Sequence, residues 1–535
     1  MKKLFLTLLT CMVAMLTNAQ TLSTTAVYSF DGLTDGAIYA LKTLNDKAPS
    51  EGWYYNDGNF KFTLNPNDIT PGKTVSADKN KFLWKVYKNS NNTISLVNMY
   101  NGVYFGKATG NTGDNLSSNT GCSEEIGEFN FEVSTKHGDN NYLDLYIQNG
   151  SNKYYIASNR NGNLGYWALS ETDVNKASVQ FYQVEDPANI ELPVKPNQPC
   201  FLRLGNGNVD DSYNVGGYIN SIDGSTVSLN GQSPNLSTLG SEWTFEGDYA
   251  KGFKIVNVKS NKVLGINTVT LNNAGDQGNT PILMYENTEN PGENISILWD
   301  VTGNTFVENG FSINVKDRIR DRANLRDGKL AFWNRGISAG SALRVYENVE
   351  LPLTLVGEKY YATTYLPFAV TIPEGVNAYT ATLNGNNVTL NAVTGVLPAE
   401  TAVILEGNAA TASFALTSEK STVDKGNMQG TLEAKTIEAG TISYLILGTK
   451  GGALGFYLPK ETMTSIAGNR AYFDISANNA AQKGFSLNFD VVSGINNAVV
   501  GNNNQGVIYD LTGRRVNNTV KGGIYICNGK KIIIK

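Results

Sequence analysis

One stretch of this chain occurs twice. Residues 84–106 read WKVYKNSNNTISLVNMYNGVYFG, and residues 243–265 read WTFEGDYAKGFKIVNVKSNKVLG. In both, the tryptophan is followed 14 positions later by asparagine and 22 positions later by glycine, and an offset of 159 residues relates them without a gap. A match at a fixed offset indicates an internal duplication. We therefore expect two related domains in tandem.

The length and composition predict several β-domains. A chain of 535 residues is too long for a single hydrophobic core. Its 54 glycines, 27 tyrosines and 17% charged residues, with short alternating apolar runs, are typical of turn-rich β structure. The formal net charge of −5 lacks the basic excess of nucleic-acid-binding proteins, so we expect no nucleic acid partner.

The N-terminus predicts export. Lys2 and Lys3 precede an apolar run over residues 4–16, and small residues at Thr17 and Ala19 suit cleavage after Ala19. This pattern is a secretory signal peptide over residues 1–19. The run is too short to span a membrane, and no later stretch reaches the roughly 20 residues that a spanning helix needs. We expect a secreted or outer cell-surface protein with no transmembrane segment.

An aromatic-x-valine step divides the first copy into thirds. It occurs at Trp84-Lys85-Val86, Phe131-Glu132-Val133 and Tyr182-Gln183-Val184, with spacings of 47 and 51 residues. Short strands separated by glycine and asparagine turns fill each third. We expect a β-trefoil-like domain over residues 27–186, a second over 197–351, and a proline-containing linker over 187–196. The tryptophans Trp84, Trp243 and Trp299 should be core residues.

Both copies resemble ricin-type β-trefoil lectin domains, whose repeats end in Gln-x-Trp. The stretch Gly278-Asn279-Thr280-Pro281-Ile282-Leu283-Met284-Tyr285, ending at Ile297-Leu298-Trp299, is similar to the last half of such a repeat. Only Gln180 keeps the glutamine among the six repeats. The resemblance implies a trefoil fold and carbohydrate or glycoprotein as the partner.

The C-terminal part changes character. Short runs about ten residues apart with Pro and Gly turns predict a β-sandwich over residues 352–490. The blocks 365–375 and 397–405 resemble an accessory domain of secreted proteins from anaerobic Gram-negative bacteria. After an Asn- and Gly-rich linker over 491–505, residues 506–535 resemble the C-terminal sorting signal of the type IX secretion system, through Tyr509-Asp510-Leu511-Thr512-Gly513-Arg514 and Gly523-Ile524-Tyr525-Ile526. That resemblance implies secretion machinery as a partner, and a small β-hairpin appendage is the alternative.

Aromatic side chains are the candidate ligand-binding residues. Carbohydrate binding needs flat aromatic faces and a few polar groups that fix hydroxyls. Neighbouring residues of a strand point to opposite faces, so one of each adjacent aromatic pair should face outward. The candidates are Trp53, Tyr55, Tyr155, Trp167 and Trp333, and packing within the domain is the alternative for each pair.

We expect no catalytic residue, cofactor or metal. The one histidine outside the leader, His137, cannot build a histidine zinc site and should be solvated. Ser338 matches Gly-x-Ser-x-Gly, but residues 342–346 read as a strand, not the helix that a hydrolase elbow requires. We interpret the adjacent Glu124 and Glu125 as surface residues, and the mixed-charge run 317–322 as a solvated loop or short turn. The three cysteines outside the predicted leader, Cys122, Cys200 and Cys527, are scattered and form neither a disulfide framework nor a metal site.

These features favour a secreted or surface-displayed, non-enzymatic protein that binds carbohydrate through its trefoil-like domains. A protein-binding adhesin or structural surface protein is the first alternative, and a β-trefoil protease inhibitor is the second. An accessory module of a glycan-degrading system is a weaker one, because no catalytic domain accompanies these modules.

Overall fold

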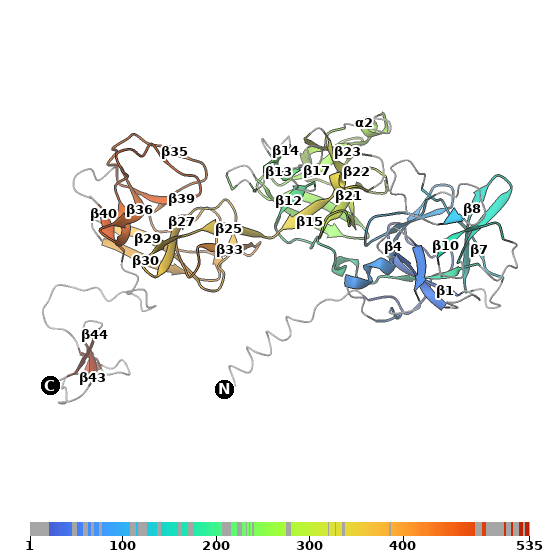
Figure 1. Cartoon of the computed structure of the whole chain (residues 1–535), viewed down its shortest axis with the longest axis horizontal. Coiled ribbons are helices and arrows are strands. Elements are labelled where there is room, and N and C mark those ends of the chain that lie inside the picture. Colours follow the sequence, from blue (N-terminus) through green and yellow to red (C-terminus); the bar gives the residue numbers. More distant parts are fainter. Residues whose placement is uncertain are drawn as a thin grey trace. The chain divides into compact units, whose positions relative to one another are not determined.

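The computed structural model describes residues 21–44, 51–56, 62–65, 69–73, 77–106, 114–115, 126–135, 141–158, 163–169, 176–205, 216–221, 227–231, 233–234, 236–237, 240–273, 280–318, 320–326, 328–333, 337–384, 387–476, 484–487, 508–509, 515–516, 524–527 and 530–533. Regular structure in these ranges is almost entirely β-strand (Figure 1). The all-β prediction is confirmed. The chain divides into two compact units, Met1–Leu487 and Asn488–Lys535.

The first copy comprises β1 (Ile38–Leu44), β2 (Glu51–Asn56), β3 (Phe62–Asn65), η1 (Ala77–Phe82), β4 (Leu83–Lys88), β5 (Ile94–Asn98), β6 (Asp114–Asn115), β7 (Asn130–Val133), β8 (Leu143–Asn149), β9 (Asn152–Ser158), β10 (Leu164–Trp167) and β11 (Ser178–Gln183). Among these, β1, β4, β5, β7, β8 and β11 close into a ring, in which a bridge from Ile94 to Phe129 joins β5 to the segment before β7. The hairpins β2–β3 and β9–β10 are attached to this ring.

The second copy comprises β12 (Cys200–Leu204), β13 (Gly217–Ser221), β14 (Val227–Asn230), β15 (Glu242–Asp248), β16 (Gly252–Asn257), β17 (Lys262–Asn267), α2 (Thr268–Asn273), β18 (Leu283–Glu286), β19 (Ile295–Ser296), β20 (Trp299–Gly303), β21 (Phe311–Val315), β22 (Arg322–Arg326), β23 (Lys329–Trp333), η4 (Ala339–Ser341) and β24 (Leu343–Tyr346). Here β12, β15, β16, β20, β21 and β24 close a ring, and β13–β14, β17–β18 and β22–β23 are hairpins. A β-trefoil in each copy stays a prediction with which these pairings agree.

The repeated stretch has the same local structure in both copies. Trp84 lies opposite Asn98, and Trp243 lies opposite Asn257. The Asn98 amide donates to the carbonyls 17 and 15 residues earlier, at 3.0 and 3.3 Å, and the Asn257 amide does the same at 2.7 and 3.3 Å. The sequence spacing of tryptophan and asparagine therefore encodes one strand pair that was copied with its hydrogen bonds.

The three predicted core tryptophans are buried. Trp84 and Trp243 are 0% exposed and Trp299 is 1% exposed. Each indole N–H donates to a backbone carbonyl of a hairpin strand: Tyr54 of β2, Ile219 of β13 and Leu264 of β17 respectively. A buried indole needs such a partner, because an unpaired N–H costs free energy on burial. The prediction for these three residues is confirmed.

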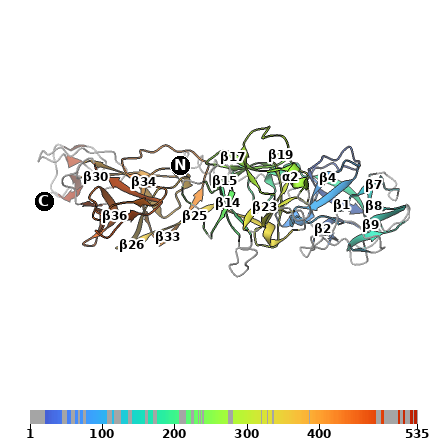
Figure 2. The same ribbon diagram turned by 90° about the horizontal axis from the view of Figure 1, so that it is seen from above.

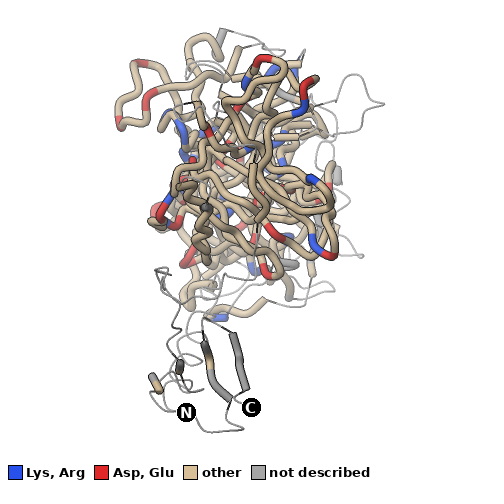
Figure 3. The backbone as a smooth tube through the Cα atoms, turned by 90° about the vertical axis from the view of Figure 1, so that its left-hand side faces the viewer, with Lys and Arg blue, Asp and Glu red and all other residues tan. Residues whose placement is uncertain are grey.

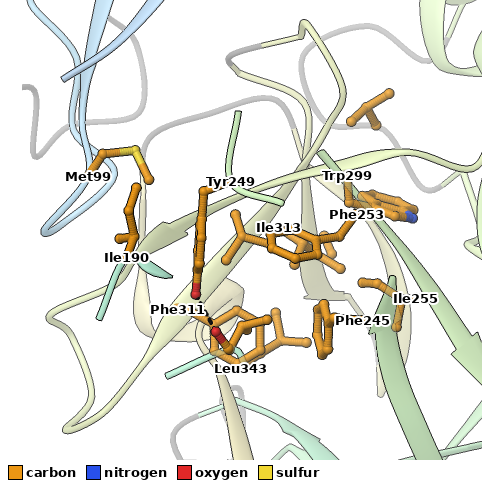
Figure 4. Close-up of a cluster of buried hydrophobic side chains, with 14 of the residues drawn as sticks. Met99, Ile190, Phe245, Tyr249, Phe253, Ile255, Trp299, Phe311, Ile313 and Leu343 are labelled. Carbon is orange, nitrogen blue, oxygen red and sulfur yellow. Dashed lines mark hydrogen bonds between the residues drawn. The ribbon is translucent and has the colours of Figure 1, made fainter. Parts of the chain in front are cut away.

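The two copies share one hydrophobic core. Ile38, Ala40 and Leu83 of the first copy belong to the same buried cluster as Trp243 and Phe311 of the second. In Figure 4, Met99 of the first copy lies beside Ile190 and Tyr249. The segment after η2 (Pro187–Asn189) joins this cluster through Ile190 and Val194, and the Tyr249 hydroxyl donates to the Val194 carbonyl at 2.6 Å. The expected linker 187–196 is therefore packed against both copies.

A buried ion pair also joins the copies. The Lys85 Nζ atom lies 2.6 Å from Asp300 Oδ1, and the side chains are 0% and 1% exposed. Lys85 also donates to the carbonyls of Tyr249 and Ala250, and the Tyr87 hydroxyl donates to Asp300 Oδ2 at 2.9 Å. Burial lowers the pKa of Lys85, and the carboxylate of Asp300 acts against that effect. With three acceptors, the buried ammonium group has all its protons engaged.

Two further groups of sheets follow the second copy. The first contains β25 (Asn348–Pro352), β26 (Thr354–Val356), β27 (Lys359–Thr364), β28 (Val370–Thr371), β29 (Val376–Asn384), β30 (Asn387–Val393), β31 (Val396–Leu397), β32 (Val403–Gly407) and β33 (Thr411–Leu416). The sheets β25-β33-β28-β31 and β26-β27-β32-β29-β30 share a buried cluster that includes Val370, Val403 and Phe414. Two sheets around one apolar cluster agree with the predicted sandwich.

The second group contains β34 (Gln429–Thr431), β35 (Lys435–Thr436), β36 (Tyr444–Lys450), β37 (Ala453–Tyr457), β38 (Ser465–Ile466), β39 (Arg470–Asp474) and β40 (Gly484–Ser486). These strands form their own sheets, β34-β39-β36-β37-β40 and β35-β38. Arg470 Nη1 donates to the Thr363 carbonyl at 3.0 Å and connects them to the sandwich. The prediction for residues 352–490 did not distinguish the two groups.

The second compact unit holds the tail. It contains β41 (Ile508–Tyr509), β42 (Arg515–Val516), β43 (Ile524–Cys527) and β44 (Lys530–Ile533), in the order β42-β41-β43-β44. The linker expected over residues 491–505 lies outside the described residues. Its sorting role, like the signal peptide over the undescribed residues 1–19, stays a prediction. Among the described residues, no helix is long and apolar enough to cross a membrane.

Candidate functional site

The outer face of β8, β9 and β10 carries aromatic and charged side chains. On these strands Leu145, Tyr154, Ile156 and Tyr166 belong to the buried core of the first copy. Side chains of a strand alternate between the two faces of a sheet. The residues between these core positions, including Tyr146, therefore face away from the core.

Three rings on that face stand in line across the strands. Tyr146 of β8 lies opposite Tyr155 of β9, and Tyr155 lies opposite Trp167 of β10. The ring centroids of Tyr146 and Tyr155 are 5.4 Å apart. We call Tyr146, Tyr155 and Trp167 the aromatic row, and Figure 2 shows the side-by-side strands β8 and β9 that carry its first two members. Strand pairing thus brings together two predicted site residues, Tyr155 and Trp167.

Exposure differs along the aromatic row. Tyr146 and Trp167 are partly exposed, whereas Tyr155 is 1% exposed. The Lys176 Nζ atom lies 3.8 Å from the ring centroid of Tyr155 and helps to cover it. No ring or cation from the described residues packs against Trp167. At the Tyr146 end, Lys153 Nζ lies 4.7 Å from the ring centroid and covers one ring face. Trp167 is therefore the more accessible end of the row, Tyr146 offers its uncovered face, and Tyr155 in the middle is not accessible.

Four ionised side chains lie beside the aromatic row, and we call them the charged cluster: Glu132, Asp144, Lys153 and Lys176. The Glu132 carboxylate accepts hydrogen bonds from Lys153 and from the Tyr155 hydroxyl, both at 2.6 Å. Lys176 Nζ lies 3.0 Å from Asp144 and 3.6 Å from Glu132. Two cations and two carboxylates compensate each other, so the charged cluster has no net charge.

The environment of Glu132 keeps it ionised. Partial burial by itself would raise the pKa of Glu132, but the hydrogen bonds from Lys153 and Tyr155 and the charges of Lys153 and Lys176 outweigh burial and lower that pKa. Asp144 is 2% exposed and is held by Lys176 and the Ser178 hydroxyl. The exposed polar groups of this face are therefore Glu132 and Lys153, whose side chains are 25% and 33% exposed.

The other predicted site residues lie on separate hairpins. Trp53 of β2 is 4% exposed and packs 5.6 Å from the ring of Tyr182. Trp53 and Tyr155 are thus buried, against the expectation that their rings are exposed to a ligand, because side chains from distant segments cover them. Tyr55 is partly exposed and contacts Phe82 at 4.7 Å.

Trp333 of β23 is the counterpart of Trp167 in the second copy. It is partly exposed, but the guanidinium of Arg326 lies 4.1 Å from the centroid of its ring. One ring face is therefore already occupied by a cation–π contact. Trp167 has no such cover among the described residues. Trp167 and Trp333 therefore differ in how much of the ring is available for stacking on a ligand.

The motifs interpreted as non-catalytic have structural explanations where they are described. Strand β24 follows Ser338, as expected, after the short turn η4. The Ser338 hydroxyl oxygen lies 3.4 Å from the Asn324 amide nitrogen and 3.5 Å from the Ser341 hydroxyl oxygen. His137, Glu124, Glu125 and Cys122 lie outside the described residues. Among the residues that are described, no group of His, Cys, Asp and Glu could hold a metal ion.

The charged run over residues 317–322 is not a fully solvated loop. Asp317 is exposed in a turn with a positive φ of 61°. Asp321 is 8% exposed and Arg322 is 1% exposed, because Arg322 begins β22 and lies opposite Trp333. The prediction is therefore wrong for the end of the run. Alternating charges gave no indication that a strand begins there.

Sequence reasoning missed Tyr146, Glu132 and Lys153. Residues 143–149 read LDLYIQN, in which apolar residues alternate with polar or aromatic ones. This alternation indicates a strand on which Tyr146 faces outward. The ligand-binding assignment itself stays a prediction for all the candidate residues.

Comparisons with known proteins do not identify a family. No protein-family model matches the chain, and no curated protein matches it. Among solved structures, an exo-β-1,3-galactanase from Clostridium thermocellum is similar at 12% sequence identity, with a TM-score of 0.21, over 57% of this chain and 82% of that one. At this TM-score the similarity indicates neither a shared fold nor a shared activity.

Proposed function

We propose that this chain is an exported, non-enzymatic protein that binds carbohydrate through the aromatic row of its first trefoil-like domain. The observation that carries the proposal is the pair of partly exposed rings, Tyr146 and Trp167, at the two ends of one row. Such rings stack on the C–H faces of sugars, while neighbouring polar groups bind hydroxyls.

The polar groups beside the rings suit sugar hydroxyls. The Glu132 carboxylate can accept further hydrogen bonds, and Lys153 can donate. Acidic and basic residues are interspersed along the backbone in the view of Figure 3. We propose a non-enzymatic role because Asp144, the second carboxylate of this face, is 2% exposed and engaged by Lys176 and Ser178.

A glycan array tests the proposal. The chain from Gln20 onward should bind at least one neutral glycan. Trp167→Ala should lower that binding about tenfold, which corresponds to about 1.4 kcal/mol, because the aromatic face on which a sugar would stack is removed. Trp333→Ala is the matched control at the counterpart position, and it should leave binding unchanged.

Thermal unfolding of each variant checks that it is folded. Absence of binding to every glycan would contradict the proposal and favour a protein-binding role, which adhesion assays and protease inhibition assays would then separate. Loss of glycan binding in Trp333→Ala but not in Trp167→Ala would place the site in the second copy.

A further inference from the structure

The aromatic row has a geometry that selects among carbohydrates. We propose that it binds an extended, neutral oligosaccharide that lies across β8, β9 and β10 and contacts Tyr146 and Trp167 with different sugar units. This inference rests on the proposed function and adds the class of glycan to it.

The separation of the two accessible rings is set by the sheet. Tyr146 and Trp167 are two strands apart, because each lies opposite Tyr155 in the strand between them. Neighbouring strands are about 4.8 Å apart, so their backbones are separated by about 10 Å. That distance exceeds one sugar ring and leaves room for a further sugar unit between the two that stack. A single monosaccharide therefore cannot stack on both rings.

The middle residue of the aromatic row, Tyr155, offers no accessible ring face to a ligand. Tyr155 is 1% exposed, its hydroxyl is bound to Glu132, and Lys176 lies over its ring. A sugar unit above this position meets no accessible ring and would be held through hydroxyls by Glu132 or Lys153. Stacking at both ends and hydrogen bonding between them requires a chain of at least three units.

The charged cluster disfavours acidic glycans. Both lysines already contact carboxylates, Lys153 at 2.6 Å and Lys176 at 3.0 Å. A sulfate or uronate bound to Lys153 would lie close to the carboxylate of Glu132, which already compensates the charge of that lysine. Repulsion at that distance selects against anionic ligands, whereas a neutral hydroxyl can join the existing hydrogen bonds.

Titration calorimetry with defined oligosaccharides tests the inference. The probes are β-1,4-linked gluco-, xylo- and galacto-oligosaccharides of one to six units, with heparin fragments of matched length as the acidic comparison. We expect affinity for at least one neutral series to rise at least tenfold between two and four units and then level off. Tyr146→Ala and Trp167→Ala should each remove most of this length dependence, while Trp333→Ala keeps it.

The outcomes separate the inference from the proposed function. A monosaccharide that binds as tightly as its tetrasaccharide, or a preference for heparin fragments that Trp167→Ala abolishes, would overturn the inference but leave carbohydrate binding intact. Array binding confined to neutral mono- and disaccharides would overturn the inference as well. Absence of binding in both experiments would overturn the proposed function together with the inference.

Discussion

At the scale of single residues, the structure contains ionisable groups whose burial has measurable consequences. Glu242 of β15 is 7% exposed, beside a cleft of about 160 Å³ lined by Pro367 and Phe368. No donor or cation among the described residues pairs with its carboxylate. Burial raises the pKa of Glu242 from 4.5 to about 7. The folded chain is therefore more stable when the Glu242 carboxyl group is neutral.

The stability of the chain should consequently depend on pH through Glu242. Between pH 4.5 and 7 the folded state holds a proton that the unfolded state has lost, so stability falls as pH rises through this range. Glu242→Gln should remove that loss and stabilise the protein at pH 8 by about 1–3 kcal/mol, with little effect at pH 4.

Scanning calorimetry at pH 4, 6 and 8 measures this effect. Glu350→Gln serves as the control, because Glu350 is exposed on β25. Equal effects of Glu242→Gln at pH 4 and pH 8 would show that Glu242 does not titrate between those values.

At the scale of elements, the duplicated strand pair depends on one asparagine in each copy. Asn98 and Asn257 make equivalent bonds to the strand that each faces. Asn98→Ala and Asn257→Ala should each destabilise the protein by about 1–2 kcal/mol, because each variant loses two side-chain hydrogen bonds to backbone carbonyls, while the Leu83 and Glu242 carbonyls keep a backbone donor. Thermal unfolding measures both variants. A loss of stability in only one of the two variants would show that the asparagine hydrogen bonds stabilise the two copies to different extents.

Alternation within strands made part of this structure predictable. The inward positions of Trp84, Trp243 and Trp299 follow from local pattern and spacing, and all three are buried. The burial of Tyr155 could not be predicted, because the covering side chain, Lys176, comes from a segment beyond β10. Outward orientation depends on one strand, whereas exposure depends on everything that packs over it.

At the scale of the whole molecule, the two copies are joined by features that neither copy reveals alone. Lys85 and Asp300 are 215 positions apart, so no sequence spacing links them. Their pairing requires both rings to be folded and in contact. The shared core and this ion pair make the duplicated region one structural body.

Breaking the ion pair should therefore weaken that body. Lys85→Met leaves the buried Asp300 with the more distant Lys316, 3.7 Å away, as its remaining cation, and a cost of up to about 3–5 kcal/mol is expected. Adding Asp300→Leu should restore part of the loss, because no buried charge then remains. Lys259→Met is the control: the Lys259–Glu400 pair is 47% and 44% exposed, and such pairs contribute at most about 1 kcal/mol. Chemical denaturation followed by tryptophan fluorescence measures all three. If Lys85→Met lowered the free energy of unfolding no more than Lys259→Met does, the buried ion pair would not join the two copies into one structural body.

The central functional claim is that one outward sheet face of the first copy holds a glycan. The most direct measurement is a crystal structure of the chain with the tightest-binding tetrasaccharide. We predict sugar density across β8, β9 and β10, with one unit stacked on Tyr146 and another on Trp167. Density for the sugar at Trp333 or in any other location, with this face empty, would contradict the account.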